Sequence, residues 1–177
     1  AKFVIYNGKI SVDGVPIKSI HHGIGLMDVV ELQGVKEIYR LVPSNGTLLK
    51  PIIIQDVDKT KKLVIVKSKT TIKNGKTQIG FNDGRSLIDD TLVNVGDTCV
   101  IQVPEQKILD VITLEENSKG LILQGINAGQ IGDIKKIKEG TFLLPKRVDI
   151  KIGERSIEIP ANLVMPIGKD KPPIQIR

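Results

Sequence analysis

The chain has 177 residues, of which 40% are hydrophobic and 26% charged, and this composition is that of a folded protein with a buried core. Its formal net charge of +6 favours a polyanionic partner such as nucleic acid, with a basic surface kept for solubility as the alternative. The sequence has neither an apolar run of about 18 residues nor a signal-peptide pattern, which argues against a membrane role. A single cysteine, Cys99, excludes an intrachain disulfide and predicts a buried thiol in a cytoplasmic protein.

The order of apolar runs along the chain predicts a mainly β protein. Aromatic residues make up only 3% of the chain, so the core is built from Ile, Val and Leu, whose β-branched members favour strands. No window of a dozen residues combines helical periodicity with capping residues. We expect strands at 3–6, 9–12, 37–42, 63–72, 98–103, 121–123 and 131–137. Asn-Gly or Asp-Gly pairs between apolar runs predict turns at 7–8, 13–14, 45–46, 74–75 and 83–84.

Three segments follow one another without a Gly/Ser-rich linker, so we expect them to pack on one another. Residues 1–34 are predicted to form strand hairpins, 35–112 a central β domain, and 113–177 a small β-barrel with a Pro-rich tail. Because the chain begins at Ala1 within an apolar run and without Met, we expect a fragment or a processed chain.

A glycine-rich loop is the most distinctive local pattern. Gly125, Gly129 and Gly132 lie between two short apolar runs, and the second run leads into Lys135, Lys136 and Lys138. A loop that is poor in side chains and lies beside lysines suits a phosphate backbone better than a small substrate. The pattern resembles the KOW motif, although an ordinary Gly-rich hairpin is the alternative.

The residues that could carry catalysis do not form a catalytic set. Gly75-Lys76-Thr77 resembles the end of a P-loop, but Thr70 stands where that motif needs its first glycine. His21 and His22 point to opposite faces of an extended chain, which makes shared metal ligation awkward. Asp89 and Asp90 are expected to cap or form a turn. We therefore expect neither an enzyme nor a bound cofactor or metal.

Lysines crowd the region between residues 59 and 76. Within the predicted strand 63–72, Lys67 and Lys69 share one face. Each lysine that neutralises a phosphate releases a counterion, which gives affinity without sequence reading. The few aromatic residues argue against base stacking with single strands, so folded RNA contacted through its backbone fits better. For any single lysine, a solvated strand face is the alternative.

The whole chain resembles the S-four-e family of archaeal and eukaryotic small-subunit ribosomal proteins. The similarity is carried by four pieces in the family's order. The pieces are Gly8-Lys9-Ile10 with Gly25-Leu26-Met27-Asp28, Phe81-Asn82-Asp83-Gly84-Arg85 with Val95-Gly96-Asp97-Thr98, the glycine loop, and Ala161-Asn162-Leu163 with Pro166-Ile167-Gly168-Lys169. The family's N-terminal basic segment and the helices of its RNA-binding domain are absent. In the family those helices carry much of the RNA contact.

This resemblance implies a structural constituent of the small ribosomal subunit in the cytoplasm, which binds ribosomal RNA and takes part in translation. It implies neighbouring ribosomal proteins as further partners, and outside the ribosome we expect a monomer. The alternatives are a KOW-containing transcription elongation factor that binds RNA polymerase and an RNA-modifying enzyme, each of which needs a further domain. The residues predicted to contact RNA are Lys9, Lys18, His22, Lys67, Lys69, Lys73, Arg85, Asn127, Gly129, Lys135, Lys136, Lys138, Lys146, Arg147, Lys169 and Lys171.

Overall fold

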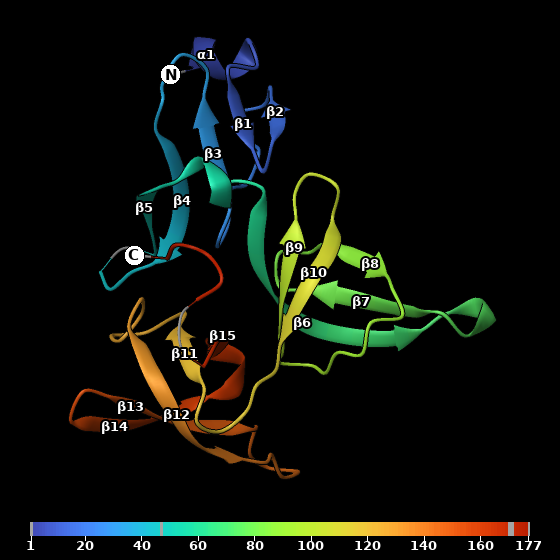
Figure 1. Ribbon diagram of the computed structural model, residues 1–177, viewed down its shortest axis with the longest axis vertical. Helices are drawn as coiled ribbons and strands as arrows, with labels where there is room; N and C mark the ends of the chain where they lie inside the picture. Colours follow the sequence, from blue (N-terminus) through green and yellow to red (C-terminus); the bar gives the residue numbers. More distant parts are fainter. Residues whose placement is uncertain (1, 47, 170–171, 177) are drawn as a thin grey trace.

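Strands dominate the computed structural model, which describes residues 2–46, 48–169 and 172–176. They form three antiparallel sheets of five strands, which occupy the upper, right-hand and lower parts of the molecule in Figure 1. This architecture confirms the prediction of a mainly β protein. The strands expected from residue 9 onward are present, with ends displaced by a residue or two.

The first sheet has the order β2-β1-β3-β4-β5. Asp13 and Gly14, with φ of 50° and 79°, form the predicted two-residue turn, because Val12 pairs directly with Val15. The boundary predicted after residue 34 falls inside this sheet, since Gly34 (φ 89°) lies between two strands that pair with each other. The strands are β1 (Ile10–Val12), β2 (Val15–Ile17), β3 (Val29–Leu32), β4 (Ile38–Pro43) and β5 (Leu49–Ile54).

The second sheet has the order β10-β9-β6-β7-β8, with the long strand β6 at its centre. The first half of β6 is buried on both faces: Leu63 and Ile65 contribute to one core, Val64 and Val66 to another. The strands are β6 (Lys61–Thr71), β7 (Thr77–Phe81), β8 (Ser86–Ile88), β9 (Thr98–Gln102) and β10 (Lys107–Ile112). Short 3-10 turns lie before β6 (η1, Asp56–Asp58) and between β6 and β7 (η2, Lys73–Gly75).

The third sheet has the order β14-β13-β12-β11-β15 and encloses its own small core around Ile134 and Ile150. Gly132 lets β13 approach closely, because a Cβ there would overlap the side chain of Ile150. Its correspondence to a KOW-type barrel stays a prediction. The strands are β11 (Lys119–Ile122), β12 (Ile131–Lys138), β13 (Arg147–Ile152), β14 (Arg155–Pro160) and β15 (Val164–Gly168), with η3 (Ala161–Leu163) before the last.

A central core lies where the three sheets meet. Val42 belongs to the first sheet and Met27 to the segment just before its strand β3. Leu63 comes from the second sheet and Met165 from the third. The segment after β15 also returns to this junction, where Ile174 and Ile176 are buried. The predicted packing of the segments on one another is therefore confirmed. Whether they fold as independent domains stays a prediction.

The expected strand at 3–6 is wrong, because these residues form the short helix α1 (Lys2–Tyr6). The Nδ2 atom of Asn7 donates to the carbonyl oxygen of Phe3 at 2.7 Å, and Gly8 follows with φ 66°. Here the Asn-Gly pair ends a helix and does not form a hairpin turn, since a left-handed glycine serves both purposes.

Cys99 is fully buried as predicted, and burial, followed by the charges of Asp97 and Asp89, raises the pKa of its thiol to about 12. Asp89 forms the expected turn, its Oδ1 accepting from the Thr91 amide at 2.7 Å. No described helix is long and apolar enough to cross a membrane.

A buried cluster of charges joins the first and second sheets. Lys62 of β6 is only 1% exposed, and its ammonium contacts Asp13 (3.0 Å), Asp83 (3.2 Å) and Asp28. The Arg85 guanidinium also contacts Asp13 and Asp83. The carboxylates come from three turns that are far apart in the sequence, so the cluster holds these turns together.

The Lys62 ammonium stays charged in this setting. Burial by itself lowers its pKa, but attraction by Asp13, a hydrogen bond to Asp28 and the charges of Asp28 and Asp83 prevail and raise it above 10.5. A raised lysine pKa stabilises the fold below pH 10.5, and that contribution is lost as the pH rises through the folded value.

A second buried cation, Arg40 of β4, links three segments through carbonyl groups. Its guanidinium donates to the carbonyl oxygens of Asp58 and Lys61, both at 2.7 Å, and of Gln175 at 3.2 Å. Burial lowers its pKa to about 10, partly offset by the charges of Asp58 and Asp13. Arg40 therefore ties the first sheet to the start of β6 and to the returning C-terminal segment.

Replacement of the central lysine tests the cluster. Lys62→Met should lower the free energy of unfolding by about 3–5 kcal/mol, because it leaves three carboxylates facing one another without their buried cation. Urea unfolding measures the change. The matched control is Lys61→Met on the other face of β6, where a change within about 0.5 kcal/mol is expected. Equal stability of the two variants would contradict the role given to the cluster.

Candidate nucleic-acid interface

The outer halves of β6 and β7 form an arm that projects from the body of the second sheet, at the right of Figure 1. A bulge between Val66 and Ser68 inserts Lys67 as an extra residue, and from there to the end of β6 every side chain is exposed. Lys69 follows on the strand, while Lys73 and Lys76 lie at the tip around η2. We call residues 67–79 the basic arm.

The lysines of the basic arm carry uncompensated charge. The sequence has no Asp or Glu between residues 59 and 82. Among the ion pairs of the described residues, none involves Lys67, Lys69, Lys73 or Lys76. The Nζ atom of Lys69 donates to the carbonyl oxygen of Val93 at 3.2 Å, which positions its charge at the root of the arm without neutralising it. The arm contains no aromatic residue that could stack on a base.

A second pair of exposed lysines lies on β12. The register shifts between Ile134 and Lys136, so Lys135 is the extra residue of a bulge and both lysines point into solvent. Lys135 lies 4.0 Å from Asp133, which is itself half exposed. Strict strand alternation would turn one of these two lysines inward; the bulge is what makes both available.

The basic residues next to this pair are already bound to carboxylates. Lys138 contacts Asp149 (3.1 Å) and Glu158, Arg147 contacts Glu158 (2.8 Å), and Lys146 contacts Glu139 (2.9 Å). The hydrogen bond to Glu158 raises the pKa of Lys138, and the same bond lowers the pKa of Glu158. These ion pairs lie at the surface, where they balance charge more than they add stability.

The glycine loop between β11 and β12 packs against the first sheet. Gly129 has φ 81°, and a Cβ at this position would overlap the carbonyl oxygen of Pro43 at the end of β4. Gly129 is therefore required for close packing between two sheets. Asn127 is half buried beside it, and its carbonyl oxygen accepts from the Gln130 amide at 3.1 Å.

The other predicted residues lie apart from one another. Lys9, Lys18 and His22 are exposed around the first sheet, Arg85 belongs to the buried charge cluster, and Lys169 contacts Glu115 at 3.2 Å. Lys171 lies outside the described residues. The fifteen predicted residues that the structure describes thus do not form one continuous site.

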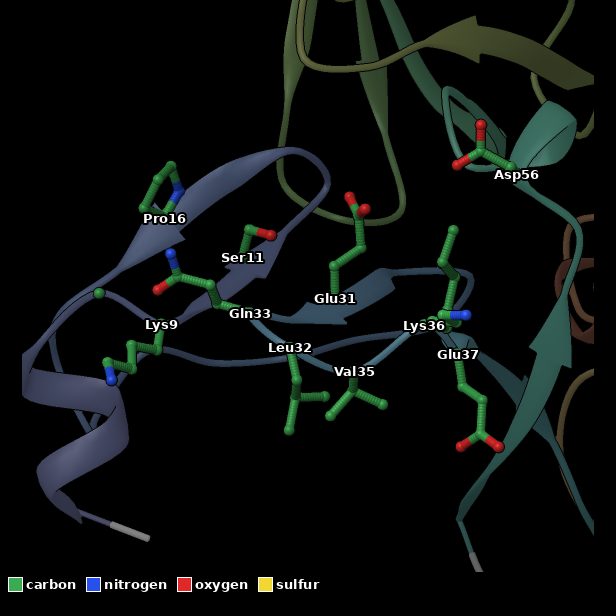
Figure 2. A pocket seen from close by; sticks show the side chains of 12 residues that line it. Lys9, Ser11, Pro16, Glu31, Leu32, Gln33, Val35, Lys36, Glu37 and Asp56 are labelled. Carbon is green, nitrogen blue, oxygen red and sulfur yellow. The ribbon is translucent and has the colours of Figure 1, made fainter.

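Lys9 lines a hollow of about 450 Å³ at the edge of the first sheet, shown in Figure 2 with Glu31, Lys36, Glu37 and Asp56. Lys59 pairs with Asp56 at 2.9 Å and with Glu31 at 3.7 Å, so charges of both signs balance there. Nowhere in the described part of the chain do three or more His, Cys, Asp or Glu residues gather to hold a metal ion. The described residues around the hollow therefore include no such set of metal ligands.

Comparison with known proteins shows the family to which this β protein belongs. A family model described as ribosomal family S4e matches residues 35–108. The small ribosomal subunit protein eS4 of Methanosphaera stadtmanae is 35% identical over 176 residues, which cover 99% of this chain and 73% of the relative. The chain belongs to ribosomal family S4e.

Further members of the S4e family show the same extent of similarity. The eS4 protein of Methanothermobacter thermautotrophicus is 35% identical over 177 residues, which cover 99% of this chain and 73% of that relative. The crystal structure of the 30S ribosomal protein S4e from Thermoplasma acidophilum matches with a TM-score of 0.81 at 30% identity, over 96% of this chain and 85% of that one. The predicted resemblance to this family is therefore confirmed.

The structure adds one residue to this S4e protein's predicted basic surfaces. Lys76 lies at the tip of the basic arm beside Lys73, exposed and within the same acid-free stretch. The sequence signal for Lys76 is the crowd of lysines between residues 59 and 76, to which it belongs, although the triplet Gly75-Lys76-Thr77 also resembles the end of a P-loop.

Alanine at Gly129 tests the contact between the third and first sheets. Gly129→Ala should lower the free energy of unfolding by about 1–3 kcal/mol more than Gly125→Ala, as thermal or urea unfolding would show. Both glycines have positive φ, at 81° and 91°, but a Cβ at Gly125 meets no atom within 4 Å. An equal loss in the two variants would mean that backbone conformation alone matters at Gly129.

Removal of the Lys138 ammonium tests whether it is engaged by Glu158. Lys138→Met should raise the pKa of Glu158 toward 4.5, although Arg147 still donates to the same carboxylate. The stability linked to the lowered pKa is present above pH 4.5 and is lost as the pH falls through the folded value. Carbon-detected NMR titration measures the shift, with Lys136→Met as a control that should leave the Glu158 pKa unchanged.

Proposed function

We propose that this S4e protein is a structural constituent of the small ribosomal subunit that binds ribosomal RNA and takes part in translation. The proposed contact with RNA rests on one observation: the projecting basic arm bears four exposed lysines without a carboxylate partner among the described residues. The curated relatives are named as proteins of the small ribosomal subunit, which supports ribosomal RNA as the polyanion.

The chemistry of the arm supports contact with phosphates. Lysines are flexible point charges that neutralise phosphate without reading bases, and each neutralised phosphate releases a counterion. Because the arm lacks aromatic residues, it offers no stacking platform for single strands. Folded RNA, whose backbone presents phosphates at regular spacing, is the form of RNA that fits the arm.

Lys135 and Lys136 form a second proposed contact, exposed together by the bulge in β12. The remaining residues predicted from the sequence stay proposals of lower rank. Those that already bind carboxylates would have to exchange these partners for phosphates, and they are Arg85, Lys138, Lys146, Arg147 and Lys169. Lys9, Lys18 and His22 are exposed but scattered.

The proposal has four further parts. The protein is not an enzyme, and its partners include neighbouring ribosomal proteins. It lies in the cytoplasmic small subunit, and outside the ribosome it is a monomer. The elongation-factor alternative is not favoured, because the curated relatives cover the chain from end to end and are named as ribosomal proteins.

Neutralisation of two arm lysines tests the RNA contact. Lys67→Gln with Lys73→Gln should flatten the slope of log K against log salt concentration by roughly two units, because two phosphate contacts are lost. Binding to small-subunit ribosomal RNA is measured across a salt series, with an unrelated structured RNA for comparison.

The matched control removes the same charge elsewhere. Lys36→Gln with Lys50→Gln neutralises two exposed lysines, one between β3 and β4 and one in β5. The salt slope should stay within half a unit of that of the unmodified chain. If the two double variants lowered the slope equally, binding would depend on net charge and the arm would have no special role.

A further inference from the structure

The loop between β12 and β13 presents three consecutive large apolar side chains to solvent. Phe142 is fully exposed, Leu143 is 85% exposed and Leu144 is 58% exposed. Single exposed apolar residues are ordinary on protein surfaces, but an apolar group concentrated at one tip marks an interaction site. We call these three residues the apolar tip; the loop that carries it lies at the lower edge of Figure 1.

The apolar tip is a closed turn. The Thr141 amide donates to the carbonyl oxygen of Leu144 at 2.8 Å, and the Leu144 amide donates to the Oγ1 of Thr141 at 3.2 Å. Gly140 lets the two sides of the loop approach, because a Cβ there would lie 2.9 Å from the Lys146 amide nitrogen. Pro145 then restricts the backbone that leads into β13. A partner would therefore meet a turn that is already formed, which reduces the entropy lost on binding.

Charge around the apolar tip is balanced. The cations at its base, Lys138, Lys146 and Arg147, each contact a carboxylate of Glu139, Asp149 or Glu158. The base of this loop thus differs from the basic arm, where the lysines have no such partners. Because these charges cancel, the base of the loop attracts phosphates less than the basic arm does. Two of the three tip residues are leucines, which neither donate hydrogen bonds to a base nor stack on one.

We propose that the apolar tip inserts into an apolar cleft on a neighbouring protein of the small ribosomal subunit. This inference rests on the proposed ribosomal function. Phe142 supplies a rigid aromatic anchor of the kind that carries most of the energy of protein interfaces, and Leu143 and Leu144 extend its apolar surface. The balanced charges at the base suit the polar rim that surrounds such an anchor.

Photo-crosslinking from the tip tests this inference. A benzoylphenylalanine replaces Phe142 in the full chain, small subunits are purified by sedimentation, and the adduct formed on irradiation is identified by mass spectrometry. We expect an adduct with one defined peptide of a ribosomal protein. The control places the same group at Glu154, an exposed position in the turn between β13 and β14 of the same sheet, and should not label that peptide.

A variant gives an independent measure. Phe142→Asp with Leu143→Asp should lower incorporation into small subunits about tenfold in competition with the unmodified chain, while the salt dependence of RNA binding stays unchanged. Absence of the unmodified chain from small subunits would overturn the ribosomal function and this inference together. Incorporation with an adduct to RNA alone, or with no adduct, would overturn this inference only.

Discussion

The contact between Lys62 and three carboxylates is the constraint on which the arrangement of this molecule depends. Removal of the ammonium would leave the carboxylates buried without a cation, and removal of the carboxylates would leave the ammonium buried without an anion. Either change would strongly destabilise the fold. The carboxylates belong to the β1–β2 turn, the segment before β3 and the β7–β8 turn. Because Lys62 and the basic arm belong to the same strand, β6, the cluster that joins the sheets also anchors the strand from which the arm projects.

Local sequence patterns predicted the strands well because alternation and β-branched residues reflect short-range preferences. The alternation of Leu63 and Ile65 with Val64 and Val66 is visible in the sequence. The two different cores that these residues enter are not, since they depend on which sheets lie on either side of β6. The helix α1 was missed because Asn7-Gly8 satisfies the requirements of a hairpin turn and of a helix end equally well.

The sequence identifies the basic residues of the candidate site but does not reveal which of them are exposed and unpaired. Sequence spacing placed Lys67 and Lys69 on one exposed face, but the bulges that expose Lys67, Lys135 and Lys136 depend on strand register, which no single strand reveals. Lys138 and Lys135 look alike in the sequence. Their difference arises from Glu158, twenty residues beyond Lys138, whose position becomes apparent only when β13 and β14 pair.

The return of the C-terminal segment to the central core has a consequence for synthesis. Ile174 and Ile176 fill the junction between sheets whose strands were all made earlier, and Gln175 bonds to Arg40 and Asp58. A chain made from its N-terminus can pair strands within each sheet as it emerges, but it cannot close this junction until Ile174 and Ile176 leave the exit tunnel. The junction between the three sheets therefore closes later than the strand pairs within each sheet.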